Sequence, residues 1–371
     1  MSADRGNELQ EIGHSGGRIT FEHDPERGTS MGISHSSPWA SAIHQVCVSY
    51  QGDVLQFVPI GGMGSEPEPY PQPSVLAFIV SDREGMFGRQ CPKCATYFRT
   101  NFLTNKTSCP YCGHRNRGVE FLTRNQLGFI AAFCRAFLET HHSGHSVTID
   151  LDDLADKLPE NRPGWVYTEE RQQSKYKCTK CRCIYDILGE YGICPHCETP
   201  NYREVIDQKL QQLEAQFAHA NESLKDRHER EVEWEKLSRC ISDFEALAKA
   251  VRAGLLRHPL SPKRRIDLSS MSFQAILPAA ELLKAWFDID VLAGLADDDK
   301  RFLHLMFNRR HVFIHNGGRV DQEYLERTQD TSVRVNQLLR LRSREIRRLL
   351  ELSRTCTANL LNGYAALQNA P

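Results

Sequence analysis

Four closely spaced cysteine pairs constrain the fold of this 371-residue chain more than any other feature. Each pair has the spacing Cys-x2-Cys, and the pairs form two groups, with fourteen and twelve residues between the pairs of each group. Four thiolates at such spacing close around one tetrahedral zinc ion, because each pair forms a turn that presents two sulfurs. The predicted ligands are Cys91, Cys94, Cys109 and Cys112 in the first group and Cys178, Cys181, Cys194 and Cys197 in the second.

Each group resembles a zinc ribbon, and the two ions are expected to be structural because four thiolates leave no open coordination position. One interpretation is that each ion only replaces the core that so small a β-module lacks. The alternative is a surface that also recognises nucleic acid, through aromatic and cationic side chains around the ribbons. These are Tyr97, Phe98, Arg99, Lys106, Arg115 and Arg117 near the first ribbon, and Lys175, Lys177, Lys180, Arg182 and Tyr185 near the second.

The other cysteines and the overall composition indicate a reducing, cytoplasmic location. Paired cysteines without an N-terminal apolar segment favour metal over disulfides, and no apolar run reaches the length of a membrane span. A formal net charge of -1 excludes a global field that would draw the chain to nucleic acid or to a membrane. The unpaired cysteines are expected in cores: Cys47, Cys134, Cys183, Cys240 and Cys356.

The first half of the chain reads as a tail followed by two zinc-ribbon modules. Residues 1–38 are rich in Gly, Ser and charged residues, which predicts a disordered tail. Residues 39–145 hold the first ribbon (91–112) and residues 146–202 hold the second (178–197). Around the ribbons, apolar patterning predicts a hairpin from Val46 to Val58, strands over 75–80 and 146–151, a helix over 122–140 and a helical turn or two over 152–158.

The second half reads as helical throughout. No proline interrupts residues 203–256, so they predict one long helix, whose first part (203–235) is a coiled-coil-like linker able to dimerise. Further helices are expected over 271–287, with a kink at Pro278, and over 332–367, and residues 236–371 should form an antiparallel bundle. The stripe behind the coiled-coil prediction is Leu210, Leu213, Phe217, Ala220 and Leu224. The fold class is thus multidomain α+β: small β-rich zinc ribbons, a long helix and a C-terminal helical bundle.

One helix of that bundle concentrates cationic side chains at its end. Asp297, Asp298 and Asp299 suit a helix start, and Asn316-Gly317-Gly318 predicts the stop, since the residue that ends a helix usually needs a positive φ. Between them, Arg310 and His315 lie five residues apart, roughly 140° around the helix, whereas His311 and His315 share a face. Arg310 and His315 therefore meet one substrate if Arg310 curls along the helix or if a two-fold dimer supplies a second copy.

Arg310-His311-x-x-x-His315 resembles the R-x4–6-H motif of HEPN domains, in which a polar residue usually follows the arginine. The following Asn316-Gly317-Gly318-x-Val320-Asp321-x-x-Tyr324 is similar to one prokaryotic branch of that superfamily. HEPN domains are dimeric helical bundles, and many are metal-independent ribonucleases. The resemblance covers roughly the last third of the chain and implies a HEPN-like bundle, a homodimer and RNA as substrate, in a toxin-like or phage-defence context.

The resemblance also implies roles for the motif residues. His315 would act as general base or acid in the attack of a ribose 2′-hydroxyl on its own phosphodiester, and Arg310 would stabilise the phosphorane charge. His311 and Asn316 would orient the histidine or bind the phosphate. A run of arginines against two acids favours phosphate contact as well; these are Arg334, Arg340, Arg342, Arg344, Arg347, Arg348 and Arg354.

Three alternatives remain open on the sequence. In non-catalytic HEPN proteins the motif arginine and histidine, here Arg310 and His315, only cap the helix and stabilise a dimer. The protein could therefore be a zinc-ribbon scaffold or a nucleic-acid-binding regulator without catalytic activity. A zinc-ribbon transcription-associated protein is the third, and it predicts DNA binding that survives deletion of everything after Leu256. A metal site on His311 and His315 lacks the helix-borne acid of a zincin motif.

Overall fold

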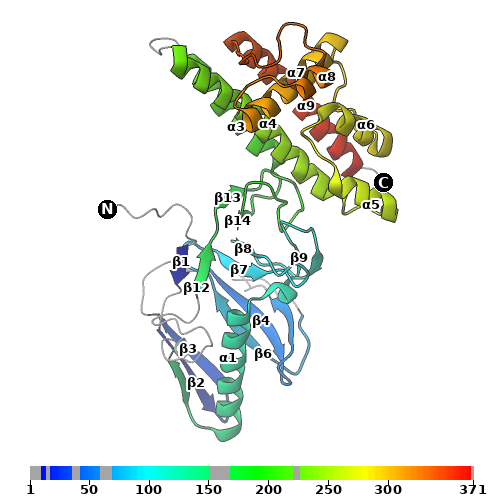
Figure 1. Cartoon of the computed structure of the whole chain (residues 1–371). Helices are drawn as coiled ribbons and strands as arrows, with labels where there is room; N and C mark the ends of the chain where they lie inside the picture. The colour runs from blue at the N-terminus through cyan, green and yellow to red at the C-terminus, as the bar shows by residue number, and fades with distance from the viewer. Residues whose placement is uncertain are drawn as a thin grey trace. The chain divides into compact units, whose positions relative to one another are not determined.

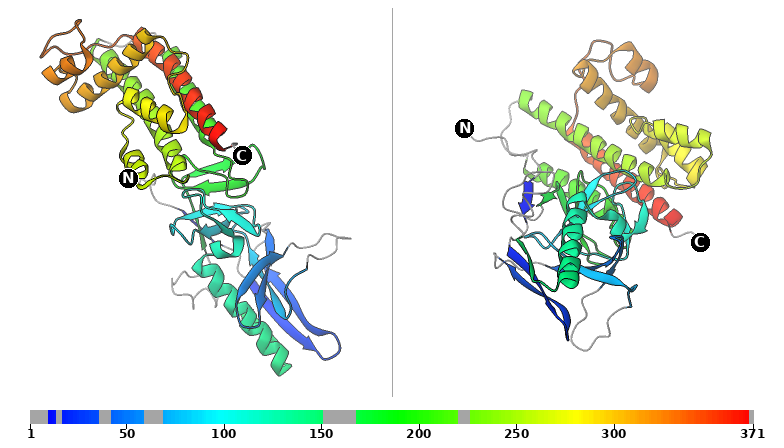
Figure 2. Two further views of the ribbon diagram at one scale, coloured as in Figure 1. Left: turned by 90° about the vertical axis from the view of Figure 1, so that its right-hand side faces the viewer. Right: turned by 90° about the horizontal axis from the view of Figure 1, so that it is seen from below.

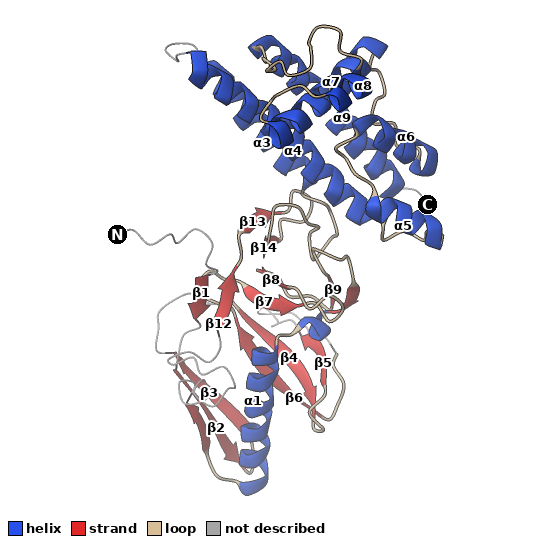
Figure 3. Ribbon diagram, in the orientation of Figure 1, coloured by secondary structure: helices blue, strands red, loops and turns tan. Residues whose placement is uncertain are grey.

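The computed structural model describes residues 10–13, 17–35, 42–58, 69–150, 168–219 and 226–368. The chain divides into two compact units, Met1–Asn201 and Tyr202–Pro371. Strands dominate the described part of the first unit and helices that of the second (Figure 3), which confirms small antiparallel sheets followed by helices. Within the described residues, no helix combines the length and the apolar character that crossing a membrane requires.

Two antiparallel sheets and one long helix form the N-terminal part of the first unit (Figure 1). Phe133 on the helix packs edge-on against Phe21, with ring centroids 5.0 Å apart. These elements confirm the predicted hairpin, strands and helix, whereas the turn predicted over 152–158 lies outside the described residues. The helix is α1 (Arg124–Ser143), one sheet holds β2 (Gly17–Asp24), β3 (Gly28–His35) and β11 (Val147–Asp150), and the other holds β4 (Ile43–Ser49), β5 (Val54–Val58) and β6 (Ser74–Val80).

The predicted disordered tail is wrong for residues 17–35, which form the β2–β3 hairpin. Ile19 and Phe21 alternate with polar residues, and both are buried. Two isolated apolar side chains are too few to predict a strand from composition. The surface that covers them comes from α1 and β11, which lie more than a hundred residues later in the chain. Residues 10–13 (β1) also pair, with β12 (Thr168–Arg171).

The first cysteine pair of each group lies in a hairpin, β7–β8 or β13–β14, of one four-stranded antiparallel sheet with the order β13-β14-β8-β7. The predicted boundary at 145/146 is wrong, because Arg99 on β8 pairs with Asp186 on β14 and β2 pairs with β11 across it. A small hairpin and a 3-10 turn complete this region. The bounds are β7 (Phe87–Gln90), β8 (Tyr97–Thr100), β9 (Lys106–Ser108), β10 (Arg115–Arg117), η1 (Gly118–Phe121), β13 (Ser174–Lys177) and β14 (Ile184–Ile187).

Helix α4 is central to the second unit, where it packs against α3, α7 and α9. Figure 2 shows α9 running alongside α4. The indole of Trp234 on α4 stacks on Phe313 of α7, with centroids 4.2 Å apart. The helices are α3 (Tyr202–His219), α4 (Asp226–Leu255), α5 (Pro262–Ser270), α6 (Ile276–Phe287), α7 (Asp297–Asn316), α8 (Gln322–Thr328) and α9 (Ser343–Gln368).

The single helix predicted over 203–256 is wrong, because α3 ends at His219 and α4 begins at Asp226. The two helices pack on one another, and α3 also contacts α9. Leu210 and Leu213 are buried in this packing, and Lys209 donates to Asp243 across it at 2.9 Å. This part of the predicted coiled-coil stripe is therefore covered by the same chain.

Two further helix predictions need correction. Pro278 lies in the first turn of α6, where no intrahelical hydrogen bond needs its nitrogen, so it starts a helix and does not kink one. The terminal helix begins at Ser343 and not near 332, because the preceding segment pairs with residues 318–320. In that pairing the amide of Val320 donates to Gln337 and that of Leu339 donates to Gly318.

Candidate metal centres and the α7 site

All four Cys-x2-Cys turns have the same backbone. The residue after the second cysteine has a positive φ in each turn, and its amide donates to the carbonyl of the first cysteine at 2.9–3.0 Å. This conformation points both thiols to one side, which is what a two-sulfur turn requires. The left-handed residues are Ala95 (φ 58°), Gly113 (φ 69°), Arg182 (φ 64°) and Glu198 (φ 63°).

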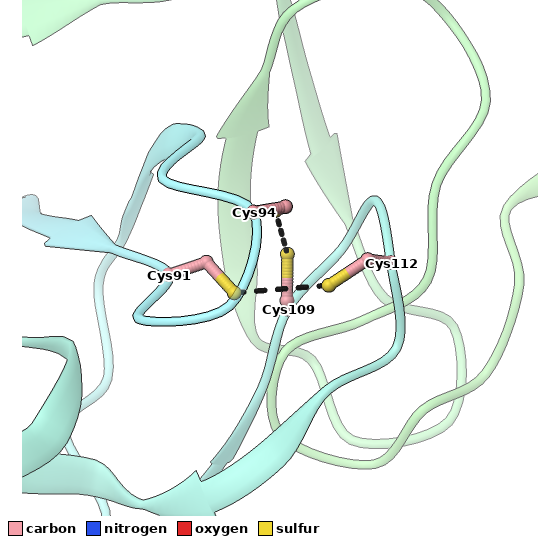
Figure 4. A group of neighbouring side chains, drawn as sticks. All are labelled: Cys91, Cys94, Cys109 and Cys112. Atoms are coloured by element: carbon pink, nitrogen blue, oxygen red, sulfur yellow. Dashed lines mark hydrogen bonds between the residues drawn. The ribbon is translucent and has the colours of Figure 1, made fainter.

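Each turn pair brings four sulfurs together as the spacing predicts. The four Sγ atoms of each group lie within 4.8 Å of one another, so each group can hold a metal ion. Figure 4 shows the first group. Within the first group, Cys91 and Cys112 are 3.7 Å apart, as are Cys94 and Cys109. In the second group, the sulfurs of Cys178 and Cys197 are 3.4 Å apart and those of Cys181 and Cys194 are 3.5 Å apart.

The two groups are related by internal pseudo-symmetry. Each begins with a hairpin, β7–β8 or β13–β14, that carries its first cysteine pair. The second pairs exchange reciprocal hydrogen bonds, because the Ser108 amide donates to Pro195 and the Ile193 amide donates to Pro110. These four residues flank Cys109 and Cys194 at matching positions. The sequence predicted two ribbons but not their assembly into one body with a shared core.

Hydrogen bonding moves two of the thiols toward the thiolate. Burial raises the pKa of Cys94, but hydrogen bonds with Thr96 and with the neighbouring thiols of Cys112 and Cys91 together outweigh burial and bring that pKa to about 7. Cys197 and Thr199 repeat this arrangement, and the pKa of Cys197 is also about 7. The cysteines outside the quartets are buried, as predicted; they are Cys47, Cys134, Cys183, Cys240 and Cys356.

The predicted aromatic and cationic surface around the ribbons is wrong in its aromatic part. Phe98 and Tyr185 are buried, and Tyr97 donates through its hydroxyl to Glu169. Arg99 is also fully buried, within a cluster of three carboxylates that sequence reasoning missed. The exposed cations of the predicted set are Lys106, Arg115, Arg117, Lys175, Lys177, Lys180 and Arg182.

Helix α7 places the predicted motif in its last two turns. The helix begins with Asp297, Asp298 and Asp299 and ends at Gly317, whose φ of 57° is left-handed, as predicted. Neighbouring Gly318 has a φ of 81° and packs beneath Phe313 and Trp234. The acidic first turn and the glycine at the end both depend on local sequence, so the bounds of α7 could be predicted without knowledge of the helices that pack against it.

The four motif residues lie in different environments. Arg310 is mostly buried and donates to Glu245 and Ser242 of α4, both at 3.3 Å. His315 is exposed, and its ring lies against that of His311 with centroids 4.4 Å apart. Asn316 donates its side-chain amide to Asp321, which also accepts from the amide of Tyr324 and caps α8.

His311 links the two ends of this motif. Burial lowers its pKa first, and the nearby charge of His315 lowers it further, so His311 is held neutral more strongly than a free histidine. It also lines a pocket of about 440 Å³ that Arg310 borders. Other lining residues are Ile276, His304, Phe307, Asn308 and Arg327, none of which the sequence singled out.

Arg309, next to the motif arginine, has a structural role. Its guanidinium is buried and donates to Tyr324, Asp330 and Glu345, which joins α7 to α8, the following loop and the start of α9. Two of the arginines predicted to meet phosphate are also paired, Arg348 with Asp299 and Arg354 with Glu214. Arg334, Arg340 and Arg342 precede α9 and so are not part of a basic helix.

Comparison of the chain with protein-family models, with curated proteins and with solved structures found no match. The HEPN resemblance therefore stays a prediction. Chemically, the chain offers two closed thiolate quartets suited to metal and a pocket beside two imidazoles and a guanidinium.

Proposed function

We propose that the protein is a metal-independent endoribonuclease of the HEPN type that cleaves RNA as a homodimer, in a toxin-like or phage-defence context. The observation that carries this proposal is the position of His311. Its ring lies against exposed His315, and it lines the same pocket as Arg310. An acid–base group and a charge-stabilising group thus border one continuous surface, although they point to different sides of α7.

The chemistry needs only side chains. His315 takes the proton of a ribose 2′-hydroxyl, whose oxygen bonds to the adjacent phosphorus while the bond from phosphorus to the 5′-oxygen breaks. Arg310 stabilises the charge on the phosphorane oxygens. His315 of a second copy protonates the leaving oxygen, so the products carry a 2′,3′-cyclic phosphate and a 5′-hydroxyl.

Exposed apolar side chains beside His315 support the dimer. Ile314 is 50% exposed and Leu338 is 46% exposed. Leu338 pairs with Arg319, four residues beyond His315. Exposed large apolar side chains favour a protein interface, and a two-fold axis near Ile314 would bring the two α7 ends to one another.

The test is cleavage of a labelled single-stranded RNA in the presence of EDTA. Arg310→Ala and His315→Ala should each slow cleavage roughly 100-fold or more. The matched controls are Arg301→Ala, an exposed arginine on the same helix, and His142→Ala, an exposed histidine of the first unit, and both should cleave at the wild-type rate. Equal rates for all five proteins would refute the assignment.

Mixing the two inactive variants tests whether the site needs both copies of His315. A dimer of one Arg310→Ala chain and one His315→Ala chain holds a single His315, whereas the proposed chemistry uses the His315 of each copy, one as base and one as acid. Activity should therefore stay low on mixing, and a return to the wild-type rate would contradict the use of two histidines. Light scattering that reports a monomer at assay concentration would contradict the dimer.

We also propose that both thiolate quartets hold zinc and that the ions are structural. Four thiolates around zinc at ~2.3 Å place their sulfurs ~3.8 Å apart, close to the 3.4–3.7 Å observed. When bound, each ion cross-links its two turns. Elemental analysis should give two zinc ions per chain, and Cys91→Ser should lower that number.

A second candidate is a non-catalytic, zinc-stapled dimeric scaffold or nucleic-acid-binding regulator. The observation that favours it is the ion pair of Arg310 with Glu245, a carboxylate only 6% exposed, which neutralises the guanidinium. In that case RNA stays intact in the same assay while gel-shift binding is retained.

A further inference from the structure

The pocket beside Arg310 has the size and the lining of a small-molecule site. Its volume of about 440 Å³ falls in the range of ~300–1,000 Å³ that ligand sites occupy. Its residues come from α4, from the start of α6, from α7 and from α8, all within the second unit. Residues from four helices that are far apart in sequence converge on this pocket, and the end of α7 does not require such an arrangement.

One side of the pocket is apolar. Ile241, Ile276 and Phe307 line it and are all at most 5% exposed, which shows that their packing is set by the bundle. Pro278 and Ala275 extend this side toward the start of α6. A planar, largely apolar group such as a nucleobase is the natural occupant of such a wall, because its faces gain contact without losing hydrogen bonds.

The lining also includes an ordered hydrogen-bond acceptor. Asn308 donates its Nδ2 to the carbonyl of His304 at 2.8 Å, which fixes the amide orientation because a carbonyl only accepts. Its Oδ1 has no partner among the described residues. His304 itself is held by its Nε2, which donates to the carbonyl of Arg327 at 3.0 Å. The pocket edge therefore offers an oxygen acceptor, which suits an exocyclic amino group.

Cationic groups border the same space. Arg327 is half exposed and pairs with exposed Glu323. The Nε of Arg310 is buried and has no partner in the described part of the chain. Glu245 also lines the pocket, but its charge is offset by Arg310. N-cap Ala275 at the start of α6 also lines the pocket and provides no side-chain cap for the first amides of that helix.

We propose that this pocket is a nucleotide-binding subsite that accepts a base with an exocyclic amino group, held between the Phe307 wall and Asn308, with its phosphate toward Arg310 and Arg327. The proposal rests on the ribonuclease function and adds the position and preference of one substrate nucleotide. Asn308 and Arg327 are positioning residues, because they meet the base and the phosphate and not the reacting atoms.

Calorimetric titration of the full-length protein with cytidine 3′-monophosphate and uridine 3′-monophosphate tests this without cleavage, since neither has a scissile internucleotide bond. The cytidine nucleotide should bind roughly tenfold more tightly, because it presents an amino group where uridine presents a carbonyl. Asn308→Leu should abolish this preference. Arg327→Gln should weaken both nucleotides several-fold, whereas Arg301→Gln, an exposed paired arginine outside the pocket, should leave both unchanged.

The outcomes separate the two proposals. Absence of saturable binding, or binding that Asn308→Leu and Arg327→Gln leave unchanged, overturns the subsite even if RNA is cleaved. Nucleotide binding with the stated pattern but intact RNA keeps the subsite and overturns the nuclease. Circular dichroism of each variant checks that it is folded. An Asn308→Leu protein that binds both nucleotides with equal affinity is also shown to be folded, because an unfolded chain would have no pocket to bind them.

Discussion

Replacing Arg99 by methionine removes the cation that three carboxylates share inside the first unit. The guanidinium donates to Asp82 at 2.6 Å and to Glu84 at 3.0 Å, and its Nε donates to Asp186 at 2.9 Å. Methionine retains most of the aliphatic length, so the change tests charge more than packing. Since Arg99 lies on β8 and Asp186 on β14, the pair joins the two hairpins that carry the first cysteine pair of each quartet.

The burial of the partners sets the expected magnitude. The side chains of Arg99 and Asp82 are 0% exposed and that of Asp186 is 1% exposed, so both carboxylates would stay buried without a counter-charge. Glu84 is discounted, because Arg171 still pairs with it at the surface. Removing one partner of a buried ion pair typically costs about 3–5 kcal/mol. The free energy of opening of this sheet should fall by that amount.

Amide hydrogen exchange of the full-length, metal-loaded protein measures this locally. A loss of about 3–5 kcal/mol corresponds to a fall of roughly 100- to 5,000-fold in the protection of β8 and β14 amides. Lys175→Met is the matched control, since Lys175 is half exposed and lies 3.7 Å from Glu84. That surface pair should contribute less than about 1 kcal/mol, a fall of under about fivefold.

The loss of stability in Arg99→Met relative to wild type, the deficit, should depend on pH in a defined direction. Burial already raises the pKa of Asp82 even beside Arg99, and loss of the cation raises it further. A carboxyl with a raised pKa binds its proton more tightly in the folded chain than in the unfolded chain, so falling pH stabilises the variant relative to wild type. The deficit should be smaller at pH 6 than at pH 8. Protection in Arg99→Met no lower than in Lys175→Met would refute the reasoning.

Three further predictions concern the turns, the helical unit and the α7 histidines. Gly113 and Arg182 both have a positive φ, which glycine adopts at no cost and other residues adopt with strain. Gly113→Ala should therefore weaken metal retention against a competing chelator by about 1 kcal/mol, and Arg182→Gly should strengthen metal retention. Gly254→Ala should destabilise the helical unit in urea, followed by circular dichroism, by roughly 1–3 kcal/mol, because a Cβ there would overlap the Tyr364 hydroxyl. Histidine hydrogen exchange should place the pKa of His311 below 6.5. His315→Asn removes the second cause of this lowering but leaves the larger cause, burial, so the pKa should return only partly toward 6.5. No change of the His311 pKa in that variant would contradict the assigned coupling.

The helices and turns with strong local signals were predictable from the sequence. The stop of α7 at Gly317 and the capping-box start of α1 at Thr123 depend only on neighbouring residues. The β2 strand was not predictable, because its two buried residues gain their partners from α1 and β11. The division of 203–256 into two helices was hidden for a similar reason, since the periodicity is the same in a straight helix and in a helical hairpin.

The candidate sites divide in the same way. The four Cys-x2-Cys turns predicted which cysteines gather into the two quartets that can hold a metal ion, because each turn is local to a few adjacent residues. The pocket beside Arg310 was invisible, since Asn308, Ile276 and Arg327 lie on three helices and carry no motif.

By itself, the sequence determined which cysteines come together into quartets that can hold a metal ion, where the strongest helix ends lie and that Arg310, His311 and His315 share one short segment. Only the tertiary structure decided that the first hairpins of the two cysteine groups join in one sheet, that Arg99 is buried among carboxylates and that Arg310 borders a pocket. Local signals depend on a few adjacent residues, whereas burial and pocket formation depend on surfaces brought together from distant parts of the chain.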